Sequence, residues 1–103
     1  MATNEEDYDM LRQQLQAEMA QKQTLQLQYN ELKRTLEDVD KTPEGEKLYE
    51  MVGQILISKT KEEIKTALKE KEEILEFRLK GATKSVDETT RRLQELQKAL
   101  EKK

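Results

Sequence analysis

The sequence predicts a mainly α protein: an antiparallel two-helix coiled-coil hairpin with one β-hairpin at the helix-connecting end. Three observations predict this fold. Two long segments without proline carry apolar residues at heptad-like spacing. Between them lies one short stretch of β-branched and aliphatic residues around a glycine. The two helical segments also differ in net charge, which favours their pairing with each other over pairing of identical copies.

Composition limits the chain to one small, mainly helical domain. Of 103 residues, 34% are hydrophobic and 40% are charged, with one Phe and no Trp, which is too little apolar volume for a thick globular core. We therefore predict a single domain over residues 1–103. Its parts are a first helix at 5–40, a linker at 41–47, a β-hairpin at 48–59 and a second helix at 60–101.

The charge is divided unevenly between the two helical segments. Residues 1–40 carry four Lys or Arg against nine Asp or Glu, and residues 61–103 carry twelve against ten. Opposite net signs favour pairing of the two segments, although exposed ion pairs contribute only about 0–1 kcal/mol each. Lys and Arg alternate with Glu and form no basic stripe, so we expect no nucleic-acid partner.

The β-hairpin is predicted from Gly53, which stands first in a two-residue loop and suits a type II′ turn. Strands 48–52 and 55–59 then pair, and both of their faces carry apolar residues. A lone hairpin of this kind is marginal in water, so we expect it to contact other subunits. The predicted assembly residues are Leu48, Tyr49, Met51, Val52, Gly53, Ile55, Leu56 and Ile57.

The first helix has an apolar stripe with one weak stretch, where Glu18 and Lys22 occupy seam positions and loose packing is expected. Pro43 and Gly45 mark its end, because the residue before proline disfavours helix and glycine permits a reversal. The stripe consists of Tyr8, Leu11, Leu15, Leu25, Tyr29, Leu32, Leu36 and Val39.

The second helix is predicted to begin at a capping box formed by Thr60 and Glu63. Its seam includes the polar residues Lys71 and Thr89. Gly81 lies within the helix, where glycine costs roughly 1 kcal/mol relative to alanine. We expect that close packing requires the glycine or that the helix tolerates a weak spot, and the alternative is a functional hinge. The apolar stripe consists of Ile64, Leu68, Leu75, Leu79, Ala82, Val86, Leu93, Leu96 and Leu100.

Ile74 and Phe77 lie off this stripe, on roughly the opposite side of the second helix. Single exposed apolar residues are ordinary in proteins. The alternative is that the two residues form a secondary contact with a neighbouring subunit.

Folding the helices back around the hairpin places Tyr29 near Lys71 and Leu15 near Val86. In this register Leu96 and Leu100 extend to or beyond the start of the first helix and leave an exposed apolar tip, roughly 50 Å from the hairpin for a helix of about 36 residues. The predicted tip residues are Met1, Tyr8, Met10, Leu11, Leu93, Leu96 and Leu100. A parallel homodimer is the alternative, but it leaves the apolar hairpin and the charge asymmetry unexplained.

Catalytic chemistry has little basis in this sequence. The chain has no His and no Cys, which removes imidazole catalysis, thiol nucleophiles and most transition-metal sites. Its three glycines are scattered and form no phosphate-binding loop. We therefore expect no enzyme activity, no catalytic or metal-binding residues and no cofactor. The longest unbroken apolar run is Ile55 to Ile57, so no membrane-spanning segment or signal peptide is expected.

The order of these elements resembles a β-type prefoldin subunit. The resemblance rests on the hairpin core Val52-Gly53-Gln54-Ile55-Leu56-Ile57, on the Thr60-Lys61-Glu62-Glu63 cap, and on the run from Lys69 to Leu79. The hairpin is the specific part, since the helices alone would match many coiled coils. The resemblance covers nearly the whole chain.

The resemblance implies an ATP-independent holding chaperone in the cytoplasm. It implies a hetero-hexamer of two α-type and four β-type subunits, joined through their hairpins, whose coiled-coil tips hold unfolded client proteins and pass them to a group II chaperonin. Residues 48–59 would then serve assembly and the tip would serve clients. Two alternatives remain open: a structural coiled-coil adaptor that joins folded partners, and an accessory arm that binds polyanions.

Overall fold

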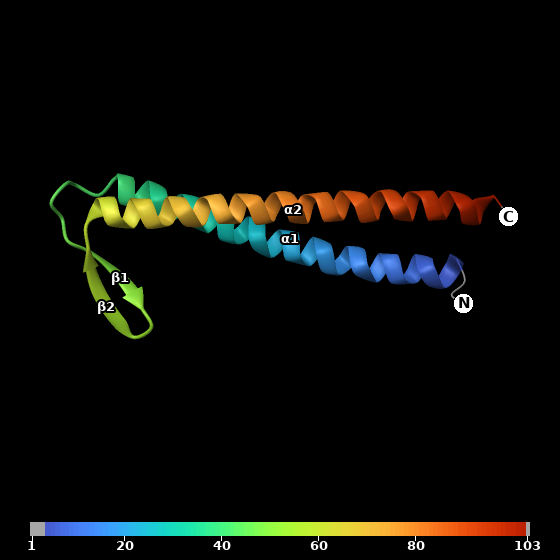
Figure 1. Ribbon diagram of the computed structural model, residues 1–103, viewed down its shortest axis with the longest axis horizontal. Coiled ribbons are helices and arrows are strands. Elements are labelled where there is room, and N and C mark those ends of the chain that lie inside the picture. The colour runs from blue at the N-terminus through green and yellow to red at the C-terminus, as the bar shows by residue number, and fades with distance from the viewer. Residues whose placement is uncertain (1–3, 103) are drawn as a thin grey trace. The chain divides into compact units, whose positions relative to one another are not determined.

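The computed structural model describes residues 4–102, which form two helices and two strands (Figure 1). Helix α1 spans Asn4–Asp40, strand β1 Leu48–Val52, strand β2 Ile55–Lys59 and helix α2 Lys61–Glu101. The two long helices pack against each other, and the two strands form one antiparallel sheet. The predicted fold class is therefore confirmed.

The chain divides into two compact units. The hairpin unit is Leu27–Glu76 and contains the end of α1, both strands and the start of α2. The terminal unit consists of the described residues of Met1–Gln26 and Phe77–Lys103. Each unit contains a stretch of both helices, so each has its own helix–helix seam.

In the hairpin unit, β1 and β2 pair in the register that a two-residue loop requires. Val52 lies opposite Ile55 and Met51 lies opposite Leu56. Gly53 has a φ of 62°, and among the described residues only Gly45 and Gly53 have positive φ, so the turn has the backbone of a type II′ loop. Cross-strand partners share a face, which gives the two predicted apolar faces.

The helix seam of the hairpin unit combines buried aliphatic residues with charged contacts at its edge. Leu36 and Val39 are buried. Lys65 Nζ lies 2.8 Å from Asp40 Oδ1, and the Tyr29 hydroxyl donates to Glu76 at 2.8 Å. Lys61 Nζ donates to the backbone carbonyls of Asp40 and Thr42, so a cation satisfies the carbonyl end of α1.

The terminal unit has a small core that is partly polar. Leu25 and Leu93 are buried at 8% and 9% exposure, and the most buried residue of this core is Thr89 at 2%. Leu15 and Val86 are half-buried on the same seam. A threonine thus occupies a seam position where a coiled coil ordinarily carries an apolar residue.

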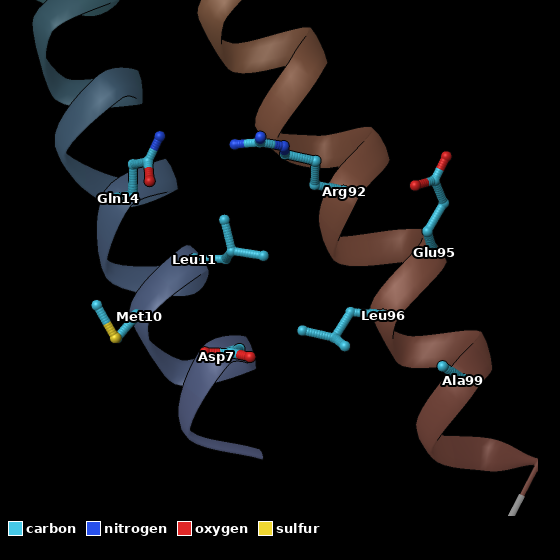
Figure 2. A pocket seen from close by; sticks show the side chains of 8 residues that line it. All are labelled: Asp7, Met10, Leu11, Gln14, Arg92, Glu95, Leu96 and Ala99. Carbon is cyan, nitrogen blue, oxygen red and sulfur yellow. The ribbon is translucent and has the colours of Figure 1, made fainter. Parts of the chain in front are cut away.

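The predicted register between the helices is wrong. Tyr29 was expected near Lys71 but bonds to Glu76, five residues further along α2. In the terminal unit, Leu96 was expected at or beyond the start of α1 but faces Leu11 instead (Figure 2). The error arises from counting back from the helix connection. The observed register is seen instead in the contacts between the helices, such as that of Tyr29 with Glu76.

The start of α2 is capped by Thr60, but only one half of the expected capping box is formed, because the Glu63 carboxylate accepts from the Thr60 hydroxyl and not from its backbone N–H. The Thr60 hydroxyl accepts the backbone N–H of Glu63 at 3.1 Å and also bonds to the Glu63 carboxylate at 3.1 Å. This satisfies one of the free donors of the first helical turn. Gly81, in contrast, has open space where a Cβ would stand, so close packing does not explain its presence in α2.

Candidate functional site

A hollow in the terminal unit lies between the first turns of α1 and the last turns of α2. Its volume is about 570 Å³. Figure 2 shows Leu11 and Leu96 pointing toward each other across the gap between the helices. The lining residues are Asp7, Met10, Leu11 and Gln14 from α1, and Arg92, Glu95, Leu96 and Ala99 from α2.

Helical spacing explains why these eight residues share one hollow. On each helix they are two adjacent residues with one residue three or four positions before them and one three or four positions after, which places all four on one face. Leu11 and Leu96 are half-buried and form an apolar floor, while Met10 is 64% exposed. Asp7, Arg92 and Glu95 add charge to the lining. The hollow therefore offers an apolar contact surface with hydrated charged groups around it.

The chemistry of this hollow suits the binding of apolar groups. Methionine is flexible and polarisable, so it adapts to apolar partners of different shapes. An open apolar surface with a charged edge can hold an extended apolar segment without selecting one sequence. Within residues 4–102, no group of three His, Cys, Asp or Glu side chains is arranged to hold a metal ion.

The structure places the predicted tip residues in different environments. Met10, Leu11 and Leu96 line the hollow together. Tyr8 and Leu100 are half-buried, and Met1 lies outside the described residues. Leu93 is buried at 9% exposure, so its side chain holds the two helices together and is not presented at the surface.

Sequence reasoning missed the polar members of the hollow and Ala99. The missing signal was the spacing of Asp7 and Gln14 around Leu11, and of Arg92 and Ala99 around Leu96. These residues could have been found once Leu11 and Leu96 were known to face each other. The wrong register hid that relation.

A second apolar surface covers both faces of the β-hairpin. Met51 is 70% exposed, and Leu48 is half-buried. Clusters of exposed large apolar residues of this kind mark interaction sites in proteins. The other exposed apolar residues of the hairpin are Tyr49, Val52, Ile55, Leu56 and Ile57.

The hairpin unit also contains a hollow of about 300 Å³ between strand β1 and the two helices. Leu48 and Met51 line it from β1, Val39 from α1, and Ile64 and Leu68 from α2. The hairpin therefore leaves apolar surface uncovered both outside and against its own helices.

Two further apolar residues are exposed on α2. Ile74, in the hairpin unit, is exposed, and Phe77, in the terminal unit, is 79% exposed. Both positions agree with their predicted place off the α2 stripe. Over the described residues, neither helix contains the long, uncharged apolar stretch that crossing a membrane requires.

Comparison with known proteins gives a consistent family. A family model described as a prefoldin subunit matches residues 3–103. The prefoldin subunit beta of Pyrococcus horikoshii is 36% identical over 88 residues, which cover 85% of this chain and 75% of that protein. The prefoldin subunit beta of Pyrococcus abyssi is 37% identical over 84 residues, covering 82% and 72%.

A solved structure agrees with these sequence relatives. The crystal structure of the prefoldin beta subunit from Thermococcus strain KS-1 matches this fold with a TM-score of 0.91 at 31% identity. The match covers 93% of this chain and 84% of that chain. The similarity therefore extends over both helices and the β-hairpin.

Proposed function

This chain belongs to the prefoldin family, and from that premise we propose that it is the β-type subunit of an ATP-independent holding chaperone. In this proposal it assembles with an α-type prefoldin subunit into a cytoplasmic hetero-hexamer of two α and four β chains. The assembly holds unfolded client proteins and passes them to a group II chaperonin. The observation that supports client binding most directly is the apolar hollow at Met10, Leu11 and Leu96.

Assembly is assigned to the β-hairpin because its exposed apolar residues are unfavourable in water unless another subunit covers them. Removing apolar area from water is favourable by about 25 cal/mol per Å², part of which offsets the entropy lost on association. Both edges of the two-stranded sheet also carry unpaired backbone groups, which can extend a sheet into a neighbouring chain. Ile74 and Phe77 would give secondary contacts between neighbouring subunits.

Client binding is assigned to the hollow of the terminal unit. Leu11 and Leu96 give a floor for apolar client side chains, and the exposed Met10 can adjust to their shape. Tyr8 and Leu100 would extend this contact. One such hollow binds weakly, because it is open and partly charged.

Weak individual sites suffice when several act on the same client. Linking binding sites in one assembly raises the overall affinity by about 10² to 10⁴ through effective concentration. Release then requires only competition at some of the sites, without nucleotide. This matches a protein whose sequence contains no phosphate-binding glycine loop.

The test replaces Met10 by serine and uses Met19 as the matched control. Both methionines lie on α1 in the terminal unit and both are largely exposed, but only Met10 lines the hollow. Each chain is assembled with an α-type partner and mixed with an unrelated denatured protein, whose aggregation is followed by light scattering. Met10→Ser should weaken client binding by about 1 kcal/mol in each β subunit, compounded over the assembly.

Met19→Ser should leave the suppression of aggregation unchanged. Equal suppression by both variants would remove the hollow from the proposed function. A wild-type assembly that fails to slow aggregation, yet binds folded partners, would instead favour the structural adaptor. Native mass spectrometry of each variant checks that its assembly is intact.

A further inference from the structure

The helix seam of the terminal unit contains a polar cluster, in which the buried Thr89 bonds to the half-buried Glu18 and the exposed Gln14 lies at the edge. The Thr89 hydroxyl lies 2.8 and 3.0 Å from the two carboxylate oxygens of Glu18 and donates to that carboxylate. Gln14 Nε2 donates to Glu18 Oε1 at 2.8 Å and approaches Thr89 Oγ1 at 3.5 Å. Thr89 is thus held between two α1 residues that lie one helical turn apart.

Glu18 and Thr89 depend on each other. Thr89 is 2% exposed, so water cannot replace its partner. Glu18 is half-buried, and a carboxylate in such a place is unfavourable unless it accepts hydrogen bonds. The apolar seam residues Leu15 and Leu93 offer no donor. The pairing of Glu18 with Thr89 is therefore specific to one alignment of α1 and α2.

The apolar stripe alone does not select this alignment. Sliding one helix by seven residues brings heptad positions back opposite heptad positions, so the two helices can still pair along their stripes. The same slide would place Glu18 opposite Ala82 or opposite Leu96, depending on direction. The carboxylate would then face an apolar side chain in the seam. Within the terminal unit, the Glu18–Thr89 pair therefore distinguishes the observed register from these slipped ones.

We propose that Thr89 and Glu18 form a register lock, which fixes the alignment of α1 with α2 in the terminal unit. Buried polar residues in coiled coils act in this way, selecting one register at some cost in stability. The lock makes Leu11 face Leu96 and so determines which residues line the hollow. Thr89 and Glu18 act as positioning residues, since neither lines that hollow with Leu11.

The register can be read by disulfide trapping, because the chain contains no cysteine. The pair Leu11→Cys and Leu96→Cys reports the observed alignment, in which these side chains face each other. The pair Leu15→Cys and Ala99→Cys reports a slide of seven residues. In the observed register that second pair is separated by about 10 Å along the helices, beyond the reach of a disulfide.

Slides in the opposite direction are reported by Tyr8→Cys with Arg92→Cys. All three cysteine pairs are introduced into the full chain and oxidised gently, and the crosslinked fractions are compared by mass spectrometry. The wild-type background should crosslink almost only through the Leu11 and Leu96 positions.

Thr89→Val keeps the shape of the side chain and removes the hydroxyl. The ratio of slipped to native crosslinking should rise by about tenfold, the effect expected for losing a hydrogen bond to a charged group. Thr89→Ser should restore the native crosslink, because it keeps the donor. Thr90→Val, the same change at the next position and outside the cluster, should leave the ratio unchanged.

The double variant Glu18→Leu with Thr89→Val separates register from stability. Its seam is fully apolar, so its thermal midpoint should equal or exceed that of the wild type while slipped crosslinks accumulate. This variant also carries the test if Thr89→Val alone unfolds. Native crosslinking in the double variant, without slipped products, would overturn the lock. No client protein enters these measurements, so this result and that of the chaperone assay are independent.

Discussion

At the scale of single residues, Gly81 and Gly53 differ in whether their backbone conformation requires glycine. Gly81 lies within α2, has no positive φ, and would meet no neighbouring atom within 4 Å if it carried a Cβ. Gly81→Ala should therefore raise the free energy of unfolding by about 1 kcal/mol, since alanine loses less conformational freedom on forming a helix. Urea denaturation followed by circular dichroism measures the change.

Gly53→Ala serves as the contrasting variant. Gly53 has a φ of 62°, a conformation that costs an L-residue with a Cβ roughly 1–2 kcal/mol. The same substitution should therefore stabilise the chain at one glycine and destabilise it at the other. Destabilisation by Gly81→Ala would indicate that α2 must bend at this residue, which would support the hinge alternative.

The ion pair of Asp40 and Lys65 gives a prediction about titration. The hydrogen bond and charge of Asp40 raise the pKa of Lys65, and the same contact with Lys65 lowers the pKa of Asp40. Because folding raises the pKa of this lysine, the contact stabilises the folded chain at pH values below the ordinary lysine pKa. This stabilisation is lost as pH rises through the raised pKa. Because folding lowers the pKa of this aspartate, the contact stabilises the folded chain at pH values above the ordinary aspartate pKa. This stabilisation is lost as pH falls through the lowered pKa.

Asp40→Asn should therefore return the pKa of Lys65 toward that of an ordinary lysine. NMR titration of the lysine side-chain carbon signals measures it directly. Asp38→Asn, which removes a carboxylate from the same last turn of α1 without touching this ion pair, should leave the pKa of Lys65 raised. A similar Lys65 titration in wild type and Asp40→Asn would contradict the assigned cause.

Thr89 illustrates what sequence reasoning can reach at this scale. The heptad pattern identifies Thr89 and Glu18 as polar residues on their seams, and both are indeed buried or half-buried. The pattern predicts loose packing around Glu18, because it treats each helix alone. The hydrogen bond joining the two residues depends on the register between helices, which no pattern along one helix contains.

At the scale of elements, the local signals are sufficient wherever the contacts are local. The β-hairpin and its turn follow from Gly53, and the cap of α2 follows from Thr60 and Glu63, residues close in sequence. The register between α1 and α2 joins residues far apart, such as Tyr29 and Glu76. It is predicted wrongly because counting from the connection ignores how side chains interdigitate.

The cap of α2 can be tested by removing the Thr60 hydroxyl. Thr60→Ala should lower the free energy of unfolding by about 1 kcal/mol, because the backbone N–H of Glu63 loses its acceptor. Thr60→Ser should retain stability close to that of the wild type. Thermal unfolding by circular dichroism compares the two variants. Equal loss in both would show that the methyl group of Thr60, and not its hydroxyl, stabilises this end of the helix.

At the scale of the whole molecule, we expect the hairpin to control chaperone function although it lies outside the hollow proposed to bind clients. Met51 and Leu56 lie opposite each other on one face of the sheet, and both are exposed. Met51→Asp with Leu56→Asp should therefore leave the chain folded, with its helical circular dichroism unchanged. It should also prevent association with an α-type partner, since charged groups would be desolvated in the interface.

Native mass spectrometry should then find the double variant in species smaller than the wild-type assembly. Ser58→Asp is the control, because it adds charge on the same face at a position that is already polar. When assembly is lost, suppression of client aggregation should be lost with it, although every hollow is intact. The overall affinity for clients should fall by up to the factor of roughly 10² to 10⁴ that linked sites contribute. Full suppression by the unassembled double variant would show that single chains hold clients strongly, and the multivalent mechanism would then be wrong.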